Sequence, residues 1–168
     1  FRLPGLLGLL SVATSLAGAE NWPGWRGPRG DGTSLEKVIP THWSSTENVS
    51  WKTPSVGQGH SSPTSWNDRI FLTTALKDTQ ERILLSLDRK TGKLLWQQTV
   101  IRAPLEAKNN ENSYASATPV TDGERIYATF LDGEDVIVAA HDLTGKQLWF
   151  SRPGRFKSQW GFSHPPLL

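Results

Sequence analysis

Cysteine and methionine are both absent from the 168 residues. Without cysteine, this stretch of chain has no disulfide, no thiolate nucleophile, no cysteine-ligated metal and no cysteine that a lipid could modify. The sequence also opens at Phe1 without a methionine and stops after Leu168, where a new strand is starting. We therefore expect both ends to lie within a longer gene product.

A large excess of charge of one sign is also lacking, because the 18 Lys and Arg residues nearly balance the 16 Asp and Glu residues and the formal net charge is +2. The basic side chains are scattered among acidic ones and form no basic stripe, which argues against a nucleic-acid partner. What the chain does have in excess is tryptophan, with eight residues. Such repeated use of one large side chain indicates a recurring structural task.

The first nineteen residues predict a cleaved signal peptide. Residues 3–16 form an apolar run, and Ala17-Gly18-Ala19 follows as a small-x-small cleavage pattern. About fourteen residues at about 1.5 Å each reach roughly 21 Å, short of the roughly 30 Å hydrocarbon core of a bilayer. The pattern favours a leader over a transmembrane span or a buried helix, with export to the periplasm or the outside and Glu20 as the first mature residue.

Two segments recur in the same order along the rest of the chain. The turn motif Asp-x-x-Thr-Gly-x-x-x-Trp at residues 88–96 returns with one turn residue fewer at 142–149, and its Gly and Trp positions recur after 53 residues. Upstream, the segment around Pro63 returns around Pro119, 56 residues later. A fixed period of this length is typical of solenoids and propellers.

Each repeat unit predicts four short strands separated by turn residues. The expected strands are residues 62–65, 70–75, 82–87 and 94–99 in the first unit, and 118–121, 126–131, 136–141 and 147–151 in the second. The mature chain holds no apolar 3.6-residue period long enough for a helix. Four antiparallel strands per unit predict an all-β fold, a β-propeller of four-stranded blades.

The domain organisation follows from these patterns. We expect the leader at 1–19, an N-terminal arm at 20–47 and the first part of the propeller at 48–168. Two complete blades fall at about 60–100 and 115–152, and a third begins near residue 160.

The recurring residues predict structural roles in the blades. The aspartate accepts backbone N–H bonds inside the turn, and the glycine takes the positive φ that lets the chain reverse. The tryptophan lies on the outer strand, where its flat ring fills the gap between neighbouring blades. These structural residues are Asp88, Gly92, Trp96, Asp142, Gly145 and Trp149.

The motif resembles the tryptophan-docking repeat Ala-x-Asp-x-x-Thr-Gly-x-x-x-Trp of pyrroloquinoline-quinone (PQQ)-type propellers, although Ser86 replaces the first alanine. Such repeats are found in quinoprotein alcohol dehydrogenases and in the outer-membrane assembly lipoprotein of the BamB type. The segments at 22–32, 48–52 and 59–63 are similar to exported bacterial PQQ-like repeat proteins. The resemblance implies seven or eight blades in the full protein, with residues 49–51 as an orphan outer strand that completes the last blade.

Two histidines are candidate ligands near the axial channel. His60 lies three residues before Pro63, and His164 lies two residues before Pro166. A histidine pair can ligate a metal or transfer protons. No third ligand occurs at metal-like spacing, which favours simple loop residues at the blade entrance and predicts no metal site.

Other candidate sites are polar loops. The resemblance makes Glu111 and Asn112 in the loop 109–114, and Trp160 in the segment 159–161, conceivable lining residues of a quinone and calcium site; ordinary interblade loops are the alternative. In the arm, Arg26 and Arg29 lie in a glycine-rich segment that can cradle an anion. That segment lacks phosphate-loop spacing, so an extended arm packing its tryptophans on the ring is the favoured interpretation.

We therefore expect a non-catalytic, exported propeller that binds an envelope protein or polysaccharide partner, with no confident cofactor and no catalytic residue assigned. The full-length protein is expected to be a monomer. The alternative is a PQQ- and calcium-dependent dehydrogenase acting on an alcohol or sugar, which the resemblance alone supports. A further alternative is an outer-membrane assembly factor of the BamB type, although Glu20 stands where a lipid-modified cysteine would follow the leader.

Overall fold

The computed structural model describes residues 19–168, so the leader predicted for residues 1–19 lies outside the described residues except for Ala19. Eight strands form two four-stranded antiparallel sheets, and each sheet takes its strands in chain order. No helix occurs within residues 19–168. The all-β prediction with two four-stranded blades is confirmed.

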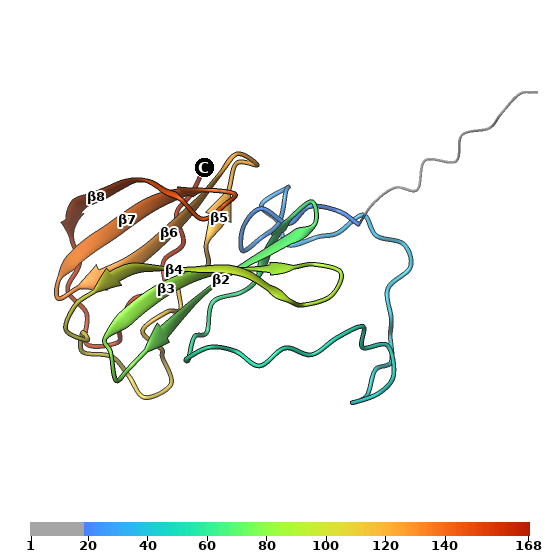
Figure 1. Cartoon of the computed structure of the whole chain (residues 1–168), viewed down its shortest axis with the longest axis horizontal. Helices are drawn as coiled ribbons and strands as arrows, with labels where there is room; N and C mark the ends of the chain where they lie inside the picture. The colour runs from blue at the N-terminus through green and yellow to red at the C-terminus, as the bar shows by residue number, and fades with distance from the viewer. Residues whose placement is uncertain (1–18) are drawn as a thin grey trace, which may run out of the picture.

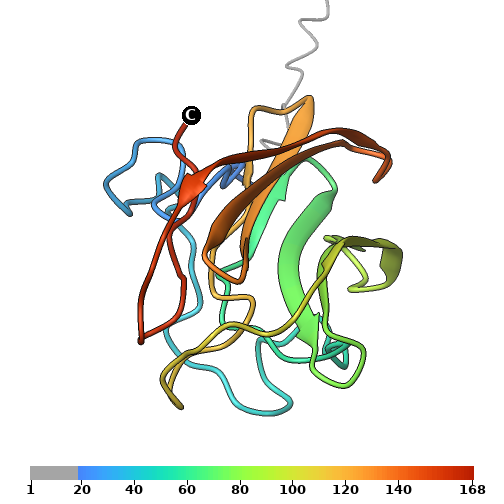
Figure 2. The same ribbon diagram turned by 90° about the vertical axis from the view of Figure 1, so that its left-hand side faces the viewer.

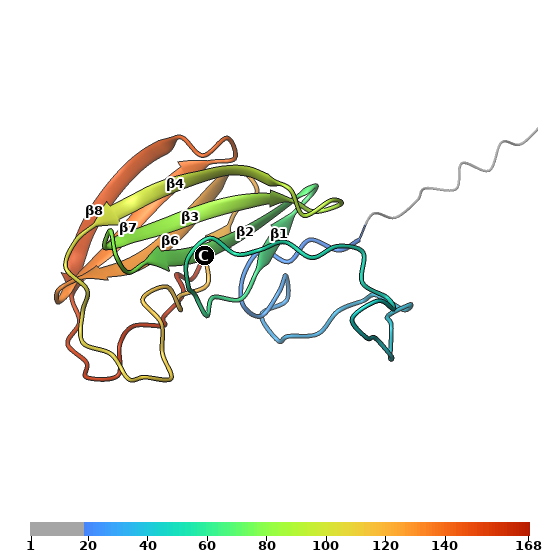
Figure 3. The same ribbon diagram turned by 60° about the horizontal axis from the view of Figure 1, so that its bottom comes forward.

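The two blades lie face to face (Figure 1). The first blade contains β1 (Thr64–Trp66), β2 (Arg69–Leu76), β3 (Glu81–Asp88) and β4 (Leu94–Arg102). The second blade contains β5 (Val120–Thr121), β6 (Arg125–Asp132), β7 (Asp135–Asp142) and β8 (Gln147–Arg155). Residues 19 to about 60, drawn from blue to teal, lie to one side of the sheets (Figure 3).

The strand bounds differ from the predicted ones at both edges of each blade. The inner strands β1 and β5 begin later than predicted, directly after Pro63 and Pro119, because proline has no N–H to donate to a strand ladder. The outer strands are longer, since β4 continues to Arg102 and β8 to Arg155. Pro153 is accommodated in β8 because the pairing with β7 is irregular between Val136 and Val138.

The outer strand predicted at residues 49–51, as the piece that completes the last blade, is not formed among the described residues and stays a prediction. No strand is assigned there, because the described part of the chain offers these residues no hydrogen-bonded neighbour. Trp51 instead reaches the turn of the first blade, where its Nε1 donates a 3.0 Å hydrogen bond to the carbonyl oxygen of Arg89. Gly92 lies against the indole ring in the same turn.

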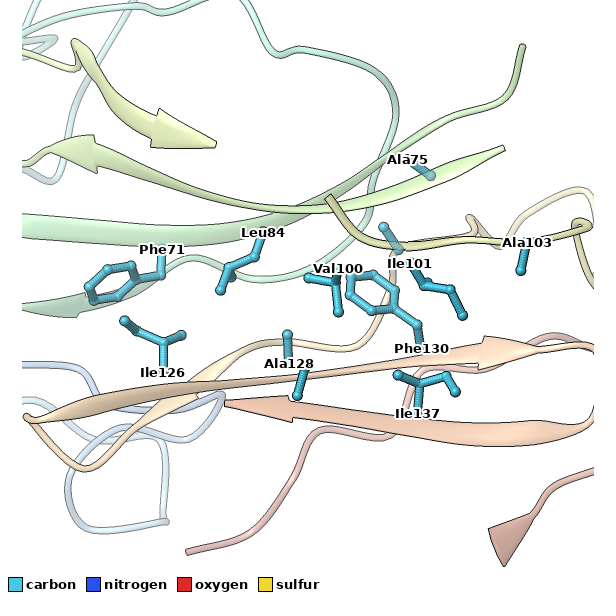
Figure 4. Packing of buried hydrophobic residues seen from close by; sticks show 12 residues of the cluster. Phe71, Ala75, Leu84, Val100, Ile101, Ala103, Ile126, Ala128, Phe130 and Ile137 are labelled. Atoms are coloured by element: carbon cyan, nitrogen blue, oxygen red, sulfur yellow. The ribbon is translucent and has the colours of Figure 1, made fainter. Parts of the chain in front are cut away.

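The main apolar core lies between the two blades (Figure 4). Phe71 and Leu84 of the first blade, both fully buried, face Ile126 and Phe130 of the second. The alternation of each strand places these side chains on the facing surfaces of two stacked sheets. Seen from the end, the second blade lies over the first (Figure 2). Burial of apolar surface between sheets therefore holds neighbouring blades together.

The turns between third and fourth strands are built alike. The Asp88 carboxylate accepts hydrogen bonds from the backbone N–H and the hydroxyl of Thr91, at 2.7 and 2.6 Å. In the second blade, Asp142 holds Thr144 in the same way, at 2.8 and 2.6 Å. These bonds stabilise the ionised form, and the hydrogen bond from the threonine hydroxyl is the main cause that lowers the pKa of each aspartate.

The glycine of each turn has a conformation that other residues rarely adopt. Gly92 has a φ of 70° and Gly145 a φ of 91°. Each glycine also leaves room for an indole ring from the segment before its blade, Trp51 against Gly92 and Trp96 against Gly145. The repeat thus joins each turn to the preceding tryptophan along the chain.

Candidate functional site

A cavity of about 450 Å³ opens where the inner strands of the blades begin. Its lining carries hydroxyl, amide, imidazole and indole groups. The lining residues are Trp25, His60, Ser62, Asn112, Ser116, Thr118, Ser163, His164 and Pro165. We call this hollow the axial cavity, because the innermost strands of a propeller face its axis.

The repeat itself builds most of this lining. Positions three and one residues before the repeat-start proline point into the cavity from three successive repeats, whose prolines are Pro63, Pro119 and Pro166. These positions are His60 and Ser62, then Ser116 and Thr118, then Ser163 and Pro165. The cavity is therefore a product of the repeat, with different side chains placed at equivalent points.

Hydrogen bonds between repeats hold these strand beginnings in place. The backbone N–H of Ser62 donates to Thr118 Oγ1 at 3.1 Å. Thr73 on β2 donates from its hydroxyl to the carbonyl oxygen of Ala117 at 3.0 Å, and the equivalent Thr129 on β6 donates to that of His164 at 3.0 Å. Each second strand thus secures the start of the following repeat, which gives the cavity a fixed wall.

The structure brings together the two polar loops that the sequence singled out. Asn112 donates from Nδ2 to the carbonyl oxygen of Trp160 at 2.7 Å, and its Oδ1 accepts hydrogen bonds from Ser113 N at 2.8 Å and from the Ser116 hydroxyl. Asn112 therefore joins the loops as a structural link. Glu111 is exposed and does not line the cavity.

His60 and His164 lie on the same cavity, although they occupy neighbouring and not equivalent repeat positions, three and two residues before the repeat-start proline. The backbone N–H of His60 donates to the carbonyl oxygen of Ala115 at 3.1 Å, and the imidazole ring takes no part in this hydrogen bond. The His164 ring packs against Phe156 and Phe162, with ring centres 5.4 and 5.7 Å away. Within residues 19–168, no group of three or more His, Cys, Asp or Glu side chains is arranged to hold a metal ion.

The N-terminal arm crosses the inner strands of both blades and reaches the cavity. Trp22 forms a two-way backbone bridge with Ser65, each bond 2.8 Å, and the carbonyl oxygen of Pro23 accepts a 2.9 Å bond from Thr121 N. These bonds place Trp25 on the lining of the axial cavity. The arm is thus held on the blades by its backbone, whereas Trp25 stays 55% exposed and is not packed on the blades as predicted.

The two arginines of the arm are already engaged. Arg29 forms a salt bridge with Glu20 at 2.6 Å, and its hydrogen bond lowers the pKa of Glu20 to about 2. The guanidinium carbon of Arg26 lies 5.0 Å from the centre of the Trp25 ring. The pairing of Arg29 with Glu20 neutralises one of the two charges that an anion cradle in the arm would use.

Arg82 holds the connection between the two blades in place, and sequence reasoning missed it. Its fully buried guanidinium pairs with Glu106 and donates to the carbonyl oxygens of Ala103 and Pro104, at 2.6 and 3.2 Å. These contacts hold the beginning of the connection that carries Asn112 to the cavity. The one available signal was a charged residue inside a strand, at the position where the second repeat has Val136.

The comparisons with known proteins agree with this repeat architecture. A family model described as outer membrane protein assembly factor BamB matches residues 41–152, well over half of the chain. The chain belongs to this family of PQQ-like repeat β-propellers. The two sheets of this BamB-like propeller chain are accordingly two successive blades.

One solved structure similar to this BamB-like chain is BamB from Moraxella catarrhalis. The two share 19% sequence identity, over 61% of this chain and 26% of that chain, with a TM-score of 0.45. This chain thus matches about a quarter of that protein's length. A search of curated proteins gave no match. In the described part of this chain, no helix is long and apolar enough to cross a membrane.

The described lining of the axial cavity offers no ligand set for the quinone and calcium that some PQQ-type propellers hold. Calcium takes six to eight oxygen ligands, usually with carboxylates among them. PQQ itself carries carboxylates, which call for Lys or Arg partners. The described lining of the axial cavity includes no Asp, Glu, Lys or Arg residue, and we derive no chemical step through either group.

Proposed function

We propose that this chain is part of a non-catalytic β-propeller that acts as an interaction scaffold in the bacterial envelope or outside the cell. The axial cavity carries the proposal, because its groups suit recognition by hydrogen bonds and stacking. Within residues 19–168, neither the ring of His60 nor the ring of His164 hydrogen-bonds a serine hydroxyl, and only the backbone N–H of His60 reaches one, that of Ser113. No activated nucleophile is therefore assembled among these residues.

Membership of a family named for an outer-membrane assembly factor supports an envelope role. A propeller offers rigid faces built from many loops, on which partners bind without chemistry. We propose a protein or polysaccharide as the partner, met at the face that contains the axial cavity. Work in outer-membrane protein assembly is the narrower form of this proposal.

The first test is titration of the intact protein with PQQ and calcium, read by tryptophan fluorescence and followed by a dye-linked dehydrogenase assay with alcohols and sugars. The scaffold account predicts no saturable quenching and no dye reduction. Quinone-dependent turnover would reject it.

A second test places a photo-crosslinking residue at Ser62, on the axial cavity, and at Gln97, which is exposed on the outer strand β4. In envelope extracts, the scaffold account predicts a discrete adduct from position 62 and none from position 97. Equal labelling at both positions would contradict a partner site at the axial face.

A further inference from the structure

Trp25 is placed as an open aromatic surface on the axial cavity. Its side chain is 55% exposed although backbone hydrogen bonds of Trp22 and Pro23 hold the arm against the inner strands. The guanidinium of Arg26 lies over the indole, 5.0 Å from the ring centre, and the exposed part of the ring is left for another group. A large aromatic ring held in water by a fixed segment is suited to contact a ligand.

The rim around Trp25 offers hydrogen-bonding groups that the protein itself does not use. The hydroxyls of Ser62 and Ser163 and the rings of His60 and His164 make no side-chain hydrogen bond with any other residue of the range 19–168. Hydroxyl and neutral imidazole groups each donate and accept. Such groups match the hydroxyls of a sugar, which also donate and accept.

The axial cavity and the neighbouring cavity differ in the charge of their lining residues. A second cavity of about 420 Å³ shares His60 and Asn112 but is lined by Lys77 and Lys108, so an anion would favour that side. The axial cavity, with no formally charged lining residue among those described, favours a neutral ligand. Its volume falls within the roughly 300 to 1,000 Å³ that small-molecule sites usually have.

From this juxtaposition we infer that the axial cavity binds a neutral carbohydrate, with one sugar ring stacked on Trp25. The C–H groups of a pyranose face carry partial positive charge and pair with the negative face of an indole. The serine and histidine groups then bond its hydroxyls. The inference rests on the proposed scaffold function and gives the chemical class of its partner.

The test is calorimetric titration of the intact protein with three neutral hexasaccharides, cellohexaose, maltohexaose and chitohexaose, and with anionic hexagalacturonate. At least one neutral hexasaccharide is expected to bind more tightly than hexagalacturonate. Trp25→Ala is expected to weaken that binding at least about tenfold, which corresponds to about 1.4 kcal/mol. Trp25→Phe, which keeps an aromatic face, should recover part of the loss.

The matched control is Trp43→Ala, because Trp43 is 70% exposed in the same N-terminal region and does not line the cavity. It should change affinity by less than about twofold. If Trp25→Ala lowers the thermal midpoint of the protein, Ser163→Ala serves as the second variant. Its exposed side chain has no described structural role, and its loss should weaken binding about threefold.

The inference is overturned if no neutral hexasaccharide binds, if hexagalacturonate binds more tightly, or if Trp25→Ala and Ser163→Ala both bind like the parent. A protein adduct from position 62 together with absent sugar binding would reject the carbohydrate and leave the scaffold proposal standing. Quinone-dependent turnover would reject the scaffold proposal, whatever the titrations show.

Discussion

The indole Nε1 of Trp96 donates a 3.0 Å hydrogen bond to the carbonyl oxygen of Leu143, so the outer strand of the first blade is joined to a turn of the second. Trp51 makes the same bond, also 3.0 Å, to Arg89. Both acceptors directly follow the turn aspartate, Asp88 or Asp142. One contact is thus repeated between successive units, and it accounts for part of the tryptophan excess.

Replacing Trp96 tests how much this contact contributes. Trp96→Phe removes the hydrogen bond to Leu143 and part of the ring that packs on the core, so the free energy of unfolding should fall by about 1 to 2 kcal/mol. The measurement is denaturant unfolding of the intact protein. Trp43→Phe, at a residue that is 70% exposed, is the control and should leave stability nearly unchanged. Equal effects of the two changes would show that docking is not stabilising.

Gly145 tests the turn side of the same contact. In Gly145→Ala the added Cβ would approach the Trp96 ring to 2.8 Å, and φ is already 91°. Gly133 supplies a matched control, since its φ is 62° and nothing lies within 4 Å of its added Cβ. Gly133→Ala should cost about 1 kcal/mol from backbone strain alone, and Gly145→Ala clearly more. Thermal unfolding distinguishes them, and equal losses would contradict steric docking.

The buried pair of Arg82 and Glu106 should respond strongly to the loss of one member. Their side chains are 0% and 6% exposed, so Arg82→Ala leaves an uncompensated buried carboxylate and should cost about 3 to 5 kcal/mol. The double variant Arg82→Met, Glu106→Met should be more stable than Arg82→Ala. As a control, Arg102→Ala breaks a pair in which the arginine is 68% exposed, and it should have little effect. A similar loss from both arginines would contradict the burial argument.

His141 should make the protein sensitive to acid. Its side chain is 1% exposed and its Nδ1 has no hydrogen-bond partner in the described part of the chain. On the neighbouring strands, His141 is paired with Ile126 and Gln147, neither of which is charged. Burial lowers the pKa of His141 below its ordinary 6.5, against an opposing effect of Asp142. As pH falls, the unfolded chain takes up the proton before the folded protein does. The contribution of neutral, buried His141 to stability is therefore complete above about pH 6.5 and is lost as pH falls below it.

The matched variant is His141→Leu, because the first repeat has Leu87 at the same position. Between about pH 6.5 and 5, the parent should lose stability faster than the variant, by at most about 1.4 kcal/mol per pH unit for one proton. Denaturant unfolding across this range gives the slope. Parallel slopes for the two proteins would contradict the assignment of acid sensitivity to His141.

Local signals made the blades predictable. Alternating apolar residues and turn motifs lie within a few residues of the strands that they specify, so all eight strands of the two blades were expected in order. Residues 49–51 carry the docking tryptophan Trp51 but form no strand among the described residues, because a strand needs a hydrogen-bonded neighbour that the local sequence does not supply. The ends of β4 and β8 depend on pairing with β3 and β7 and were predicted too short.

The candidate site was predictable only where the repeat controls it. His60 and His164 reach one cavity because both lie in the short segment before a repeat-start proline. The bond from Asn112 to Trp160 joins residues 48 apart, and the pairing of Arg82 with Glu106 follows the path of a nonrepeating connection. Trp25 reaches the cavity because backbone hydrogen bonds hold the arm, and such bonds need no particular side chain that could be recognised in the sequence.

The central claim is that the repeat builds a ring whose inner strands open on one axial cavity. A crystal structure of the intact protein tests it most directly. The account predicts that Trp149, which is 43% exposed here, docks on a glycine turn of a third blade, and that Ser62, Thr118 and Pro165 line one central channel. A structure in which Trp149 faces solvent and these strand beginnings face separate surfaces would contradict it.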